Sequence, residues 1–396
     1  MRSLQDLINS TAILHYKEID LGLDRCLNLL EKLDNPHLKI PPVFHVSGTN
    51  GKGSTLAFVK QILEDNHYRV HRYTSPHLVH FNERIELCGK PADETLLAGE
   101  LAEILRINDG LPITTFEIIT CLAFVLFSKI PADFTLLEVG VGGRLDATNV
   151  IQQPLITAIT SIGYDHQDFL GSTLGLIAFE KAGIIKPQVP VVTPSNIDPD
   201  ALSVIDAVAK QNKAPLVLAE SVTRDVGLYG THQRYNAAVA VKMIECAGIK
   251  CVDIESSLKK TRWSGRLEKI EMNSHEIWLD GAHNQAGAKA LAETLTFINP
   301  DLWTFFIHIK ARKDAEAMLV ELAPIAGAFY FINLPIEGGE AMSINELMLI
   351  ANKFAIPAFV IETLPDLKRV VTQTSEPKIM TGSLFWVGYV LSNLTN

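Results

Sequence analysis

The sequence lacks the cysteine patterns of a disulfide framework or a metal-binding cluster. Its cysteines are scattered, odd in number and form no CxxC pair. That usage predicts reduced thiols and a cytoplasmic protein. The five positions are Cys26, Cys88, Cys121, Cys246 and Cys251.

Long hydrophobic runs are also missing. The longest apolar stretch, Ile118 to Phe127, is too short to span a bilayer and predicts a buried helix. The N-terminus is polar from Arg2 onward and contains no apolar signal-peptide core. The sequence therefore predicts no membrane partner.

Positive charge is not in surplus either. With 35 Lys+Arg against 45 Asp+Glu, the formal net charge is -10, whereas nucleic-acid binding usually needs a basic face. Small anionic substrates remain possible, because a local site can be positive on an acidic protein. The 396 residues, 47% hydrophobic and 20% charged, predict an ordinary globular chain of about two domains without internal repeats.

Apolar runs alternate with helical patterns along the whole chain, which predicts two α/β domains with mostly parallel sheets. The first series of expected strands is Val43–Val46, Arg69–Tyr73, Phe134–Val139 and Leu155–Ile162, with helices over Thr55–Asn66 and Phe116–Ser128. The second series is Ile277–Asp280, Phe305–His308, Ala328–Ile332, Phe359–Glu362 and Lys378–Thr381. The polar segment Thr261–Leu267 separates them, so we expect domains of residues 1–263 and 264–396 with a ligand cleft between them.

A glycine-rich turn, Ser47-Gly-Thr-Asn-Gly-Lys-Gly-Ser-Thr55, follows the first expected strand. Glycines let several N–H groups face one anion, and a following helix adds its partial positive charge. Lys52 can reach the outer phosphates, and Ser54 or Thr55 offers a hydroxyl. The spacing is shorter than GxxxxGK[ST], so we interpret it as a variant phosphate-binding loop.

Polar residues also follow the next three expected strands, and ligands bind at the carboxyl ends of strands in open α/β sheets. Glu138 ends an apolar strand, where a carboxylate is costly unless it is paired or bound to metal. Mg²⁺ takes one or two carboxylates together with phosphate oxygens. Taken alone, Ser75 indicates a simple turn, and His166 is equally well a structural histidine or a ligand. Because Ser75, Glu138 and His166 all follow strands of the same expected sheet, together they favour a ligand-binding site.

Lys181 allows two interpretations. The segment Glu180-Lys181-Ala182-Gly183 alone predicts a helix end capped by Gly183, with Lys181 solvent-exposed. The alternative depends on the resemblance described next.

Taken in order, the motifs resemble the Mur ligase superfamily, and within it the family of bifunctional dihydrofolate synthases/folylpolyglutamate synthases. The resemblance covers nearly the whole chain. Its landmarks are IDLGLDR (19–25), VSGTNGKGST (46–55), TSPHL (74–78), TTFE (114–117), LLEVGVGGRLDATN (136–149), DHQDFLG (165–171), EKAGIIK (180–186), HQRYNAA (232–238), SGRLE (264–268), LDGAHN (279–284) and TGSL (381–384).

The resemblance implies an ATP-dependent, amide-forming ligase. Such an enzyme joins L-glutamate to dihydropteroate and to the glutamate tail of folates through an acyl phosphate. It implies a P-loop ATPase-like N-terminal domain, a Rossmann-like C-terminal domain that acts on the glutamate side, two Mg²⁺ ions and a monomer.

The resemblance also implies roles for individual residues. Metal ligands would be Ser75, Glu138 and His166. Lys181 would be carbamylated and so become a carboxylate near the second Mg²⁺, and the catalytic set would be Lys52, Lys181 and His283. The ATP contacts would be Thr49, Asn50, Gly51, Lys52, Gly53, Ser54, Asn236, Arg266 and Asp280. The substrate-binding residues would be Ile19, Asp20, Leu21, Gly22, Thr114, Thr115, Phe116, Glu117, Leu145, Asp146, Ala147 and Ser383. Phe116 would stack on the pterin, whereas periodicity alone would place it in the core.

Two departures from the family pattern stand out. The segment from about Ala219 to Tyr235 is shorter than in long-form bacterial members, where it carries extra strands beside the ATP site. The turn Lys310–Asp314 keeps only the terminal pair Lys313-Asp314.

Three alternatives remain at this stage. One is a folylpolyglutamate synthase without the first activity. A cell-wall Mur ligase is disfavoured, because only about 45 residues precede the phosphate loop, too few for a UDP-sugar domain. A nucleotide-binding regulator is disfavoured by the presence of Glu138, His166 and Lys181 together.

Overall fold

The chain folds into two compact units, each built on one sheet. The computed structural model describes residues 2–15, 17, 19–272, 275–336 and 338–394, so the outer limits of the expected domains, residues 1 and 396, lie outside it. Unit 1 comprises Met1–Val226 and Arg234–Thr261, and unit 2 comprises Gly227–Gln233 and Arg262–Asn396. Both sheets are mostly parallel and covered by helices, which confirms the predicted α/β class.

The sheet of unit 1 has the strand order β4-β3-β2-β5-β1-β6-β7-β8. The six strands β2, β5, β1, β6, β7 and β8 run parallel, and β3 and β4 are added antiparallel at the edge beside β2. Strands β1, β5 and β6 are almost fully buried, as expected of central parallel strands. The bounds are β1 Val43–Ser47, β2 Val70–Tyr73, β3 Ile85–Leu87, β4 Lys90–Pro91, β5 Phe134–Glu138, β6 Ile156–Ile159, β7 Val191–Pro194 and β8 Leu216–Ala219.

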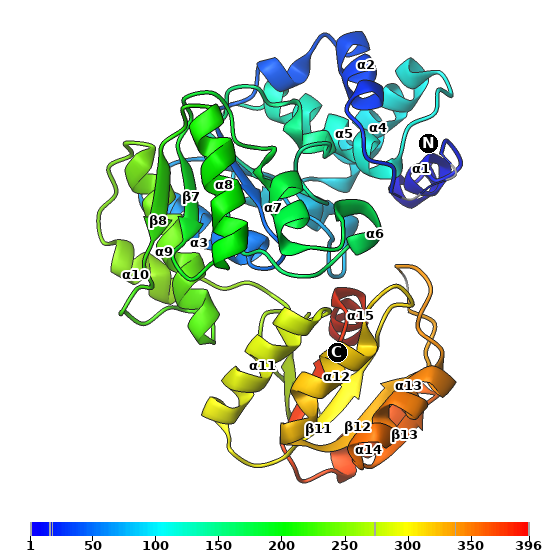
Figure 1. The fold of residues 1–396 in the computed structure, drawn as a ribbon. Coiled ribbons are helices and arrows are strands. Elements are labelled where there is room, and N and C mark those ends of the chain that lie inside the picture. Colours follow the sequence, from blue (N-terminus) through cyan, green and yellow to red (C-terminus); the bar gives the residue numbers. More distant parts are fainter. Residues whose placement is uncertain (1, 16, 18, 273–274, 337, 395–396) are drawn as a thin grey trace. The chain divides into compact units, whose positions relative to one another are not determined.

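The helices of unit 1 include the predicted buried one. Helix α5 begins with a capping box between Thr114 and Glu117 and buries most of its apolar side chains. It shares one hydrophobic core with α1, α2 and α4, and these four helices gather at one end of the unit (Figure 1). The bounds are α1 Leu4–Thr11, α2 Asp24–Lys32, α3 Lys52–Asp65, α4 Glu94–Asn108, α5 Thr115–Lys129, α6 Gln167–Leu170, α7 Leu174–Ala182, α8 Pro199–Gln211, α9 Thr231–Cys246 and α10 Ile254–Lys260.

Unit 2 holds a second sheet with the order β13-β12-β11-β14-β10-β9, parallel except for β9. Its core lies between the strands and the helices α11, α12 and α13. The strands are β9 Glu268–Met272, β10 His275–Leu279, β11 Trp303–Ile307, β12 Ala326–Ile332, β13 Ala358–Ile361 and β14 Lys378–Thr381. The helices are α11 Gln285–Ile298, α12 Ala315–Leu322, α13 Ile344–Ala351, α14 Leu364–Gln373 and α15 Leu384–Leu394.

The shortened segment forms neither helix nor strand over residues 220–230, between β8 and α9. Its last part, Gly227–Gln233, packs with unit 2. Across the described part of the chain, no helix has the length and apolar character needed to cross a membrane.

Candidate active site

The glycine-rich turn between β1 and α3 is folded tightly against the end of β6. Ser161 holds it with two acceptors, because its carbonyl takes the Thr49 N–H at 2.7 Å and its hydroxyl takes the Asn50 N–H at 2.9 Å. Gly51 has a φ of 87°, and a Cβ there would lie 2.4 Å from Asn236 Oδ1, so only glycine fits. The turn places the first N–H groups of α3 at the carboxyl edge of the sheet. That first turn contains Lys52, Gly53 and Ser54.

Two lysines converge on one carbonyl of this turn. Lys52 Nζ and Lys181 Nζ each donate to the carbonyl oxygen of Gly48 at 3.1 Å. Lys181 is only 4% exposed, and burial, reinforced by the charge of Lys52, lowers its pKa to about 7. The prediction of a solvent-exposed Lys181 is therefore wrong.

The burial of Lys181 follows from how α7 ends. Its last turn packs against the glycine loop after β5, where Arg144 N donates to Glu180 O at 2.7 Å. A Cβ on Gly143 would lie 2.8 Å from the Lys181 carbonyl oxygen, so the two segments approach at backbone distance. This contact turns the Lys181 side chain toward the phosphate loop.

The predicted metal ligands follow three strands near the centre of the same sheet. Glu138 ends β5, is 6% exposed, and accepts a hydrogen bond of 3.4 Å from the Ser75 N–H, which follows β2. His166 follows β6, on the other side of β1. It is the N-cap of α6 and has a left-handed φ of 51°, and its Nε2 lies 3.9 Å from Asp165 Oδ1. The described residues contain no cluster of three or more His, Cys, Asp or Glu side chains arranged for a metal.

The three segments expected to bind the acceptor meet at one place. Gly22 N donates to Leu145 O at 3.2 Å, which joins the first segment to the third. Arg25 joins the first to the second, with Nη1 2.8 Å from Asp20 Oδ2 and Nε 3.1 Å from Glu117 Oε2. Ile19 and Leu21 are half-buried, Ala147 is buried, and Thr115 Oγ1 lies 2.8 Å from Thr11 Oγ1.

Phe116 lies at the border between this place and the glycine loop. Its ring is half-buried, and a Cβ on Gly140 would lie 2.5 Å from Phe116 Cζ. The ring centroid is 6.0 Å from that of Tyr73. Phe116 therefore packs against the hydrophobic core of unit 1, and part of its ring remains exposed.

Asp146 is committed to the glycine loop. One carboxylate oxygen accepts the N–H groups of Gly140 and Val141 at 3.0 and 2.9 Å, and the other accepts the N–H and hydroxyl of Thr148 at 3.0 and 2.6 Å. Burial raises the pKa of Asp146, and these hydrogen bonds oppose the shift. The side chain is 2% exposed, so it shapes the loop that follows Glu138 and approaches the Phe116 ring at Gly140.

We expect Asp146→Ala to lower the free energy of unfolding by about 3 kcal/mol or more, because it leaves buried N–H groups without an acceptor. Urea titration measures this change. Asp206→Ala, which removes only a surface pair with Lys210, should change stability by less than about 1 kcal/mol. Equal effects of the two substitutions would contradict the role of Asp146.

Unit 2 gathers its predicted residues at the carboxyl ends of β10 and β14, which are neighbours. Asp280 accepts from Leu267 N at 2.9 Å and Ala282 N at 2.8 Å; burial raises its pKa, and the charge of Arg266 opposes this. His283 Nδ1 lies 2.8 Å from Gly281 O. Ser383 is buried after β14, and its hydroxyl accepts from Phe385 N at 3.2 Å.

Comparison with known proteins identifies the family. Residues 46–221 match the family model of the Mur ligase middle domain. The chain is 36% identical to the dihydrofolate synthase/folylpolyglutamate synthase of Bacillus subtilis over 94% of this chain and 95% of that protein. The chain belongs to the dihydrofolate synthase/folylpolyglutamate synthase family.

Solved structures agree with this membership. FolC of Escherichia coli, in complex with DHPP and ADP, has a TM-score of 0.89 and 27% identity, covering 99% of this chain and 97% of that one. The bifunctional synthase of Yersinia pestis with Mn, AMPPNP and L-glutamate bound has a TM-score of 0.87 and 26% identity, covering 99% and 98%. Both α/β domains of the family fold are thus present in this member.

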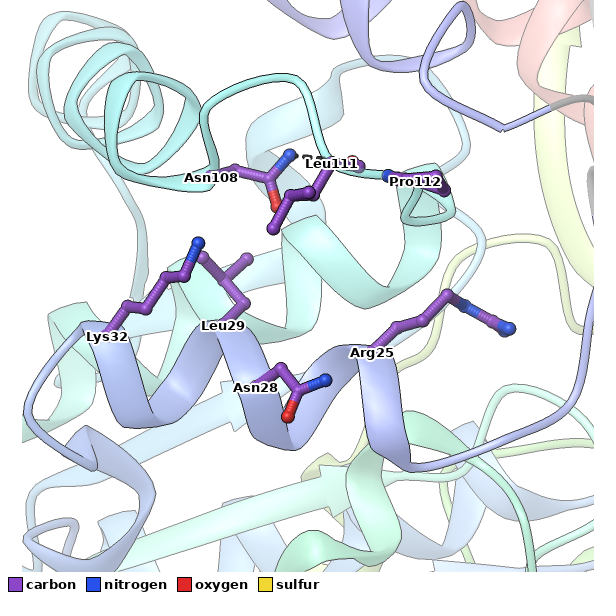
Figure 2. A pocket seen from close by; sticks show the side chains of 7 residues that line it. All are labelled: Arg25, Asn28, Leu29, Lys32, Asn108, Leu111 and Pro112. Carbon is purple, nitrogen blue, oxygen red and sulfur yellow. Dashed lines mark hydrogen bonds between the residues drawn. The ribbon is translucent and has the colours of Figure 1, made fainter.

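One feature of this family member was missed by sequence reasoning. A cavity of about 190 Å³ opens between α2 and the connection from α4 to α5. Figure 2 shows Arg25, Asn28 and Lys32 projecting from one helix, with Leu111 and Pro112 from the connection opposite. Arg25 belongs to the motif at 19–25 and borders both this cavity and the acceptor segments, but the sequence alone offered no reason to single it out.

Lys181 makes stability depend on pH. Its folded pKa of about 7 lies below the ordinary 10.5, so between these values the unfolded chain binds a proton that the folded chain does not. The free energy of unfolding should therefore rise with pH across this window, by at most about 1.4 kcal/mol per unit, and fall as pH drops toward 7. Urea titrations in CO₂-free buffer should show a flatter dependence for Lys181→Met. An unchanged slope would contradict a buried, neutral Lys181.

Proposed function

We propose that this chain uses ATP and Mg²⁺ to ligate L-glutamate to dihydropteroate, giving dihydrofolate, and to the glutamate tail of folates. The single observation that carries this is the convergence of Lys52 and Lys181 on the Gly48 carbonyl, at the sheet edge that also holds Glu138 and Phe116. The phosphate loop and Lys52 would bind the outer phosphates of ATP, and the neighbouring acceptor segments would bind the molecule whose carboxylate is activated. The Bacillus subtilis relative carries both activities in its name.

The chemistry explains why a phosphate site and an acceptor site must adjoin. A carboxylate does not react with an amine at neutral pH, so its oxygen first attacks the γ-phosphorus of ATP, and ADP leaves. The glutamate amine then attacks the acyl carbon, the C–N bond forms, and phosphate departs with one oxygen of the acceptor carboxylate. Lys52 and the N–H groups of α3 stabilise the charge that develops on the transferred group.

Mg²⁺ fits the residues at the strand ends. Glu138 is a buried carboxylate that accepts a hydrogen bond from the Ser75 N–H. His166 follows β6, on the other side of β1. Such a sparse set suits an ion that takes most of its ligands from phosphate and water. When bound, the ion neutralises phosphate charge. We assign Ser75, Glu138 and His166 to hold it, and the Yersinia pestis structure contains Mn.

Carbamylation of Lys181 is part of the proposal. CO₂ adds only to a neutral amine, and a pKa of about 7 leaves a large neutral fraction at physiological pH. The addition forms an N–C bond, releases one proton and converts a buried amine into a carboxylate. That carboxylate would add negative charge to that of Glu138, and a second Mg²⁺ needs this additional charge.

The remaining roles follow the place of each residue. Phe116 would stack on the pterin, with the segments 19–22, 114–117 and 145–147 around it, and Asp146 would act as a positioning residue. Asn236, Arg266 and Asp280 would contact ATP, and His283 and Ser383 would act on the glutamate side, so residues 264–396 form the glutamate-side domain. We also propose a cytoplasmic location, since all five cysteines are free thiols, and a monomer, as the family resemblance implies.

A ligation assay tests the proposal. The protein is incubated with ATP, Mg²⁺, L-glutamate and either dihydropteroate or tetrahydrofolate, and products are identified by mass spectrometry. We expect one added glutamyl group on dihydropteroate and one or more on tetrahydrofolate. Product from tetrahydrofolate alone would leave a folylpolyglutamate synthase, and no product from either would refute the function.

A further inference from the structure

Arg84 is a half-buried cation that forms no ion pair with any carboxylate in the described part of the chain. It ends the short 3-10 helix Phe81–Arg84, which precedes β3. No Asp or Glu of the described residues forms an ion pair with it, whereas the half-buried Arg25 and the buried Arg72 are paired with Glu117 and Glu86. Burial lowers the pKa of Arg84, and the interaction with Tyr73 acts in the opposite direction. An unpaired guanidinium in such a place is costly unless an anion reaches it.

The neighbouring acid is occupied elsewhere. Glu83 accepts the N–H groups of Leu78, Val79 and His80 at 2.7, 3.1 and 2.7 Å. Arg84 Nε instead donates to His77 Nδ1 at 2.9 Å. This bond fixes the guanidinium and leaves the four N–H donors of its two terminal nitrogens for a ligand.

Arg84 lies between the metal loop and the acceptor segments. Its carbonyl accepts from Thr74 N at 3.0 Å, one residue before Ser75. On the other side, Arg84 Cζ lies 5.8 Å from the centroid of the Phe81 ring, and Phe81 packs against the same hydrophobic core as Phe116. The Tyr73 hydroxyl is 3.1 Å from Thr120 Oγ1, which in turn donates to the Phe116 carbonyl at 2.8 Å. Arg84 is thus joined by hydrogen bonds to the segment that carries Ser75, next to Tyr73, whose ring lies 6.0 Å from that of Phe116.

The phosphates of ATP are a poorer match for Arg84. The phosphate loop follows β1, whereas Arg84 leads into β3, and β2 and β5 lie between these two strands. Three strand spacings separate β3 from β1 by roughly 14 Å. The anion that Arg84 meets therefore belongs to the acceptor.

We propose that Arg84 binds the carboxylate that is not activated when the acceptor already ends in glutamate. Dihydropteroate has one carboxylate, and that group must reach Lys52. An acceptor ending in glutamate has two, of which the γ-carboxylate is activated and the α-carboxylate is left over. Arg84 is thus a specificity residue for chain extension and dispensable for the first ligation. This inference rests on the proposed function of the same site.

The test compares acceptors that differ only in this carboxylate. KM is measured for tetrahydrofolate, for its α-carboxamide and for dihydropteroate, with the unmodified protein, Arg84→Gln and Arg84→Lys. For the unmodified protein we expect the α-carboxamide to raise KM about 10- to 100-fold, the range of a charged hydrogen bond. Arg84→Gln should raise KM for tetrahydrofolate to that level, with no further rise for the α-carboxamide. Its KM for dihydropteroate should change by less than about twofold.

Controls separate this role from a structural one. Arg84→Lys keeps the charge without the planar fork, so its KM for tetrahydrofolate should be intermediate. Arg106→Gln, which removes an exposed arginine paired with Glu103, should leave every KM unchanged. The inference is overturned if Arg84→Gln still prefers the α-carboxylate, or if KM for dihydropteroate rises equally. Absence of ligation by the unmodified protein with all acceptors would refute the proposed function itself.

Discussion

Lys52→Ala should lower kcat by at least about 10³-fold while leaving the fold intact. Lys52 begins α3 and, among the described residues, donates to the loop carbonyls of Gly48 at 3.1 Å and Thr49 at 3.4 Å. Removing it therefore breaks no ion pair within the described part of the chain, and Lys52 is not part of the hydrophobic core. It removes the positive charge closest to the α3 N-terminus, where the transferred phosphoryl group would develop charge.

The measurement is steady-state turnover with saturating ATP, together with the thermal unfolding midpoint. Lys210→Ala, which removes a surface lysine paired with Asp206, is the matched control and should keep full activity. A Lys52→Ala variant with normal turnover would contradict the phosphate-loop assignment. A variant that loses activity only because it unfolds would show a lowered midpoint.

Lys181→Ala should be nearly inactive, for a different reason. Lys181 is buried beside Lys52 with a pKa of about 7, which suits reaction with CO₂ and not service as a permanent cation. Lys181→Ala removes the side chain beyond Cβ together with the carbamate, which leaves room for a small carboxylate such as acetate, so acetate should restore part of the activity. We expect a loss of about 10²-fold or more, as for other charge-stabilising groups.

Two observations distinguish the carbamate from a plain lysine. Activity of CO₂-depleted protein should recover on addition of bicarbonate, and more slowly below pH 7, where the amine is protonated. Lys181→Arg, which retains a cation, should stay inactive. Full activity in Lys181→Ala, or activity that never responds to bicarbonate, would contradict carbamylation of Lys181.

Much of the fold could be predicted, because the central strands are continuous apolar runs that end in glycine or polar residues. The expected strand at Val43–Val46 and helix at Phe116–Ser128 match β1 and α5 closely. Strand β8 was missed, since only Ala219 of its four residues is buried and an exposed edge strand has no strong pattern. The packing of Gly227–Gln233 with unit 2 could not be predicted either, because the local sequence does not indicate which distant segment it contacts.

The site shows the same division between local and distant causes. The capping box between Thr114 and Glu117 can be recognised in the sequence, because its two residues are only three positions apart. The burial of Lys181 cannot, because it depends on the approach of α7 to a glycine loop about 40 residues earlier. Arg25 and Glu117 form an ion pair across 92 positions, and the isolation of Arg84 follows from Glu83 bonding elsewhere. Such pairings become visible only in three dimensions.

The central claim is that ATP activates the carboxylate of the acceptor. Its most direct test uses dihydropteroate labelled with ¹⁸O in that carboxylate, incubated with ATP, Mg²⁺ and L-glutamate, with mass analysis of the released phosphate. The account predicts phosphate release that requires the acceptor and carries one ¹⁸O atom per product formed. Phosphate released without acceptor, or without the label, would contradict an acyl phosphate route at this site.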